Sequence, residues 1–228
     1  MGESILLQQT VWHRAASFAG LLMASALVLA GPDEDYAAGF KSFQENDIVG
    51  AMTPLRSAAN AGHAKAQVLL AQILDRSEFD EDAVALYRKA AEQGDPDGMF
   101  GLGAMTASGE GLKKKDLIEG RSWILKAAEL GHKQAISVMA QAYLKGELGL
   151  TEAERAEPVA LRWVKLAAEN DYLPAIDALI VAYGAGNFLR VTPDRALVEQ
   201  YQAQANKIRN VAPVKAKKKP RRVSQVAE

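Results

Sequence analysis

Small and bulky apolar residues recur along the chain in a fixed register, with polar residues between them. In each copy an alanine pair is followed by a turn residue. A small residue lies four positions after the turn residue, and a bulky apolar residue lies four positions further on. These spacings place the apolar positions on one face of a helix. The pairs and turn residues are Ala58-Ala59 with Gly62, Ala90-Ala91 with Gly94, Ala127-Ala128 with Gly131, and Ala167-Ala168 with Asp171.

The spacing of the copies predicts a repeat protein. Successive second alanines are 32, 37 and 40 residues apart, a period typical of stacked supersecondary units. Each unit is predicted to be two antiparallel helices, and neighbouring units must stack because neither helix can bury its apolar face alone. The expected all-α fold has five helix pairs, at residues 34–46 with 47–61, 63–77 with 80–93, 96–109 with 116–130, 132–146 with 156–170, and 172–186 with 193–208.

Two stretches resemble the second helix and exit turn of the SEL-one-like repeat, a relative of the tetratricopeptide repeat. These are Tyr87–Gly94 and Trp123–Gly131, while Leu102–Met105 with the following Gly109 and Gly111 resembles its first helix and glycine loop. The resemblance spans about residues 36 to 206. It implies a right-handed, tetratricopeptide-like α/α-solenoid that acts as an adaptor or scaffold, with no catalytic residues to carry over.

An uncharged apolar segment at residues 15–30 precedes the repeats. Its length is short for a membrane span but suits a signal-peptide core, and Val28 and Ala30 fit the small residues before a cleavage site. Residues 1–30 are therefore predicted to be a signal peptide, with an uncleaved inner-membrane anchor as the alternative. Together with the resemblance and the absence of cysteine, this segment predicts a periplasmic protein whose solenoid occupies residues 31–208.

Charge divides the remaining chain into two parts. Residues 31–206 carry 18 basic and 26 acidic side chains, a net charge of −8, whereas residues 207–228 carry eight basic and one acidic. Residues 209–228 are therefore predicted to be a separate, disordered basic tail. Either the tail contacts anionic lipid, cell-wall polymer or an acidic partner, or it only improves solubility. The cations concerned are Lys215, Lys217, Lys218, Lys219, Arg221 and Arg222.

The chain shows no constellation that would support catalysis, a metal or a cofactor. Nucleophile-elbow, paired-histidine and phosphate-loop motifs are all missing, so the protein is predicted not to be an enzyme. His63 and His132 share one repeat position after a turn glycine, where capping is favoured over metal binding. Trp123 and Trp163 also share a position, which favours packing between units. The basic tail has no aromatic residue to stack on a base, so nucleic acid is not an expected partner.

The predicted function is protein binding by a monomeric, non-catalytic scaffold of the bacterial envelope. Exposed positions of the first helices would contact the partner, and Phe100 would either line a peptide groove or pack against the next unit. The alternative is a structural envelope component tethered by its basic tail. The expected partner-binding residues are Lys41, Gln72, Phe100, Gln141 and Asp177.

Overall fold

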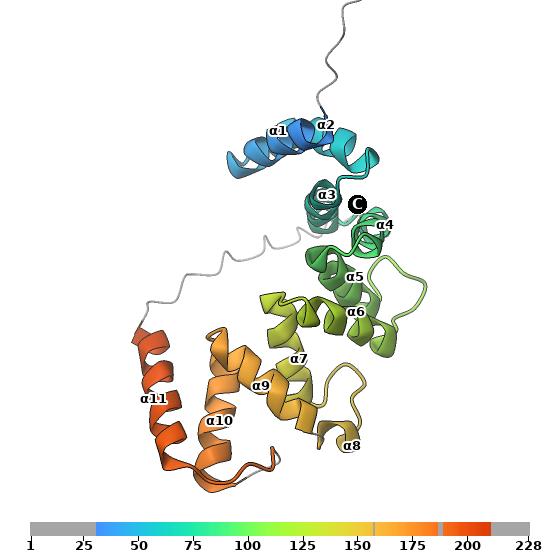
Figure 1. The fold of residues 1–228 in the computed structure, drawn as a ribbon. Coiled ribbons are helices and arrows are strands. Elements are labelled where there is room, and N and C mark those ends of the chain that lie inside the picture. The colour runs from blue at the N-terminus through green and yellow to red at the C-terminus, as the bar shows by residue number, and fades with distance from the viewer. Residues whose placement is uncertain (1–30, 157, 187–188, 211–228) are drawn as a thin grey trace, which may run out of the picture. The chain divides into compact units, whose positions relative to one another are not determined.

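A computed structural model describes residues 31–156, 158–186 and 189–210, and this part of the chain folds into helices without strands (Figure 1). The predicted signal peptide and most of the basic tail lie outside the described residues. The helices are α1 Pro32–Gln44, α2 Ile48–Asn60, α3 Ala64–Arg76, α4 Asp80–Glu92, α5 Pro96–Ser108, α6 Leu117–Glu129, α7 Lys133–Lys145, α8 Glu152–Arg155, α9 Pro158–Glu169, α10 Leu173–Ala185 and α11 Arg195–Asn210.

The helices pack in consecutive pairs, which confirms the predicted all-α fold of five pairs. The pairs are α1 with α2, α3 with α4, α5 with α6, α7 with α9, and α10 with α11, and each second helix also packs against the first helix of the next pair. The predicted boundaries agree to within about three residues. The last helix continues to Asn210, two residues into the segment predicted as tail.

The short helix α8 was not predicted. Thr151 caps its first turn, and Glu154 completes a capping box by accepting a hydrogen bond from the Thr151 backbone N–H at 2.8 Å. Arg155 then donates to the carbonyl oxygens of Tyr143 and Leu144, at 2.9 and 2.8 Å. The long connection between α7 and α9 is thereby fixed to the end of α7.

The alanine pairs lie where each second helix meets the next first helix. All eight alanines are at most 3 % exposed. The first alanine of each pair accepts a hydrogen bond through its carbonyl oxygen from the N–H of the residue after the turn, at 2.9–3.1 Å. The turn residue itself is left-handed, as in Gly131 with φ 85°, so each helix ends in a Schellman-type turn.

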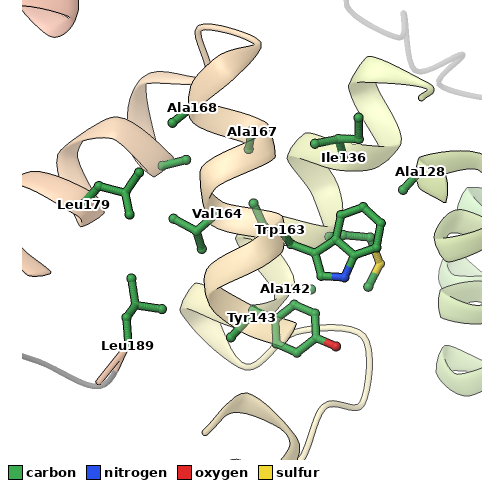
Figure 2. Close-up of a cluster of buried hydrophobic side chains, with 14 of the residues drawn as sticks. Ala128, Ile136, Ala142, Tyr143, Trp163, Val164, Ala167, Ala168, Leu179 and Leu189 are labelled. Atoms are coloured by element: carbon green, nitrogen blue, oxygen red, sulfur yellow. The ribbon is translucent and has the colours of Figure 1, made fainter. Parts of the chain in front are cut away.

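Buried side chains form two clusters, one spanning residues 51–105 and the other residues 124–205. Trp163, only 1 % exposed, lies in the second cluster, and Figure 2 shows its indole directed from α9 toward α7 near Ala142 and Tyr143. Trp123 is half-buried against the first cluster. Both tryptophans thus pack in the buried clusters, although the Trp163 indole is directed at α7 of its own unit, whereas packing between units was predicted.

Helices α5 and α6 approach so closely that a side chain would not fit at Gly103. A Cβ atom there would lie 2.8 Å from the Gly120 carbonyl oxygen and 2.9 Å from the Ile124 backbone nitrogen. Backbone atoms cannot move away as a flexible side chain would. The contact therefore requires glycine.

We expect Gly103→Ala to lower the free energy of unfolding by about 1–3 kcal/mol, the usual cost of overpacking. Thermal unfolding followed by circular dichroism measures the change. Gly184→Ala is the matched control, because a Cβ in that exposed position of α10 would meet only a Val198 methyl at 3.8 Å. The control should be neutral or more stable by up to about 1 kcal/mol. Equal melting of the two variants would contradict the proposed close approach.

Candidate functional site

A groove lies over the first helices of three consecutive units, α3, α5 and α7. Its hollow measures about 380 Å³. Two of the five predicted partner-binding residues, Gln72 of α3 and Phe100 of α5, line it together. The other lining residues are Asp75, Tyr87, Asp97, Gly101, Ala104, Met105, Ser108, Glu110, His132 and Gln134. We call this hollow the α3–α5–α7 groove.

One wall of the groove is a stack of Phe100 on His132. The ring centroids are 4.7 Å apart and the planes are inclined by 25°. His132 is the N-cap residue of α7, and its Nδ1 accepts a hydrogen bond from the Ala135 N–H at 3.0 Å. Its Nε2 lies 3.0 Å from Oδ1 of Asp97. Both ring nitrogens are therefore engaged, and the position of the Phe100 side chain is set by a residue of the next unit.

The same arrangement occurs once more in the described chain. His63 caps α3 by accepting from the Ala66 N–H at 3.1 Å, stacks on Tyr36 at 4.5 Å, and places Nε2 3.4 Å from Asp33. The capping role predicted for both histidines is confirmed. The shared pattern was not recognised in the sequence. It consists of an aspartate, an aromatic residue three positions later, and a histidine cap at the start of the next unit.

Tyr87 of α4 also lines the groove, next to Gly101 of α5. A Cβ at Gly101 would lie 2.4 Å from the Tyr87 ring, so the absent side chain leaves room for the ring. Burial, together with the nearby Asp75 carboxylate, raises the pKa of Tyr87 to about 12. The phenol is consequently neutral at ordinary pH.

The charge of the groove is negative. Its lining contains the carboxylates Asp75, Asp97 and Glu110 and neither lysine nor arginine. The Asp97 side chain is 57 % exposed, and Glu110 is exposed. A ligand in this groove would therefore meet carboxylates beside a partly exposed aromatic ring, an arrangement that favours cations.

The other three predicted contact residues lie away from the groove. Lys41 is an exposed residue of α1, 4.0 Å from Glu45. Gln141 accepts a hydrogen bond from the Tyr172 hydroxyl at 2.7 Å and donates to Glu147 at 2.9 Å. Asp177 accepts from Arg209 at 2.6 Å. All three thus have a contact within the solenoid, Lys41 only with a residue of its own helix. The six predicted cations of the tail lie outside the described residues.

Among the described residues, no group of three or more histidine, cysteine, aspartate or glutamate side chains is arranged to hold a metal ion. Within the same residues, no helix combines the length and the apolarity needed to cross a membrane.

Five helix pairs that stack through recurrent small residues define an α/α-solenoid protein. The Sel1 repeat family model matches residues 64–95, 96–132 and 134–172. Residues 64–172 of the chain therefore consist of Sel1 repeats, as the resemblance predicted. The three matched repeats contain α3, α5 and α7, the helices that line the groove.

Two solved structures share the fold. A Sel1 repeat protein from Oxalobacter formigenes is 25 % identical, with a TM-score of 0.60 over 76 % of this chain and 70 % of that one. A protective antigen present in uropathogenic Escherichia coli strains, which displays the same repeat fold, is 27 % identical with a TM-score of 0.64. That alignment covers 78 % of this chain but only 38 % of the antigen. No curated protein matches the chain.

We expect His132→Ala to destabilise the solenoid by about 1–2 kcal/mol, because it removes a helix cap and an aromatic stack. His132→Asn keeps a side-chain acceptor for the Ala135 N–H and should lose less than half as much. Thermal unfolding of the two variants and the parent measures the difference. If the alanine and asparagine variants melted together, the cap would not contribute to stability.

Proposed function

We propose that this chain is a non-catalytic scaffold of the bacterial envelope that binds an extended segment of a partner protein in the α3–α5–α7 groove. The observation that carries the proposal is the groove itself, where three successive repeats contribute an amide, an aromatic ring and carboxylates to one hollow. Sel1-repeat solenoids are commonly protein-interaction scaffolds. The envelope location rests on the apolar segment at residues 15–30.

Side chains of the groove are held in fixed positions, which supports binding of a peptide-like ligand. Phe100 is stacked on His132, and His132 is held through both ring nitrogens. Side chains that are already fixed lose little conformational entropy when a ligand binds. The lining combines polar and apolar side chains, which suits a protein segment better than a small apolar molecule.

A substitution at Ala104 tests the proposal. Ala104 is an exposed residue of α5 that lines the groove, so Ala104→Arg should fill the hollow without disturbing the core. Ala203→Arg is the matched control, since Ala203 is exposed on α11 outside the groove. The tagged full chain would be crosslinked in intact envelopes, and the proteins recovered would be compared by quantitative mass spectrometry.

We expect one protein to be recovered with the parent and with Ala203→Arg, and at least about tenfold less of it with Ala104→Arg, a loss of ~1.4 kcal/mol in binding. Equal recovery with both variants would rule out the groove as the binding surface. Circular dichroism of both variants would verify that the fold is retained.

A further inference from the structure

We propose that the α3–α5–α7 groove is the docking site for the basic segment Lys215–Arg222 of this chain's own tail, in the same molecule or in a second copy. This inference rests on the proposed function, because it takes the groove to be the binding surface. It goes beyond the proposed function by identifying one segment that binds in the groove. A docked tail would compete with any partner segment for the same hollow.

Charge complementarity is the first argument. Six of the eight residues from Lys215 to Arg222 are lysine or arginine. The groove carries three carboxylates and neither lysine nor arginine in its lining, and its histidine, His132, lies 3.0 Å from the carboxylate of Asp97. Opposite charges on the segment and the groove speed their encounter and favour a basic segment over a neutral or acidic one.

The chemistry of the groove wall is the second argument. Phe100 has one ring face against His132 and is still partly exposed. A guanidinium group stacks well on such a ring and can reach neighbouring carboxylates at the same time. Asp97 lies one helical turn before Phe100, and Glu110 follows the end of α5. Arg221 and Arg222 supply the matching guanidinium groups.

A second acidic hollow makes the inference specific. It is lined by Glu78, Phe79, Asp80, Glu81, Asp82, Gly111 and Leu112. Lys113, Lys114 and Lys115 follow directly in sequence, so three cations accompany the loop that forms one side of this hollow. Neither hollow has a lysine or arginine in its lining, and each contains one phenylalanine. The α3–α5–α7 groove differs because its phenylalanine, Phe100, is held in place by the stack on His132, whereas Phe79 is 58 % exposed. We therefore assign the tail to the groove.

Paramagnetic relaxation in the full chain tests the assignment. The sequence has no cysteine, so Ser224→Cys creates a single site for a nitroxide label two residues beyond Arg222. Amide signals of Gly101, Ala104 and Ser108 should lose at least half of their intensity, and reduction of the nitroxide should restore them. The effect should disappear in 0.5 M NaCl, where charges are screened beyond a few ångströms.

Variants of the labelled chain provide the controls. Ala104→Arg should abolish the broadening, and Glu110→Gln should weaken docking roughly twofold to fivefold, the range for one exposed ion pair. Glu129→Gln removes an exposed carboxylate on α6 that is not part of the groove, and it should leave the effect unchanged. Mixing labelled chain with isotope-enriched, unlabelled chain separates docking within one molecule from docking on a second copy, and either result supports the inference.

Unaffected groove signals, or broadening at Asp80–Asp82 instead, would overturn the inference. If the Ala104→Arg variant nevertheless failed to recover the partner protein, the proposed function would still hold. Groove broadening combined with unchanged partner recovery would instead support the tail as occupant and reject the groove as the partner's site.

Discussion

The structure depends on the close contact between the end of each second helix and the start of the next first helix. Two alanines that are almost fully buried allow the helices to approach, and the first of them accepts the hydrogen bond that closes the turn. A larger residue in either position would separate the helices. The contact also sets the direction in which the chain leaves the turn. Each unit is therefore positioned by its contacts with the neighbouring unit in the sequence.

The groove is a consequence of that turn. The residue that donates its N–H to the alanine carbonyl is also the N-cap residue of the next helix, and in two units it is histidine. The imidazole caps its own helix with one nitrogen and faces an aspartate of the preceding first helix with the other. Its ring then holds an aromatic side chain of that preceding helix. Thus a feature needed for stacking also orders Phe100, the side chain best placed to meet a ligand.

The sequence predicted the features that repeat and missed those that depend on single contacts. Helix pairs, buried alanines and histidine caps follow from local spacing, and all were found. Helix α8 was missed because its capping box lies in the connection between the two helices of one unit, α7 and α9, and has no counterpart elsewhere in the repeat. Gln72 and Phe100 line one groove, and their common face follows from helical periodicity. Gln141 and Asp177 have the same register but are engaged by Tyr172 and Arg209, and no local pattern indicates such contacts.

Charge is the other feature that the repeat does not determine. The alanine and glycine register requires small residues at the contacts between helices, but it leaves the exposed faces of the first helices free to vary. On α3 and α5 those faces carry Asp75 and Asp97, while the basic residues of the C-terminal segment are collected within a few positions. Because a basic segment tethered to the same chain has a high effective concentration, even weak ion pairs would keep it near an acidic groove. A partner would then have to bind more tightly than the tail in order to displace it, so the tail would set the affinity that a partner segment must exceed.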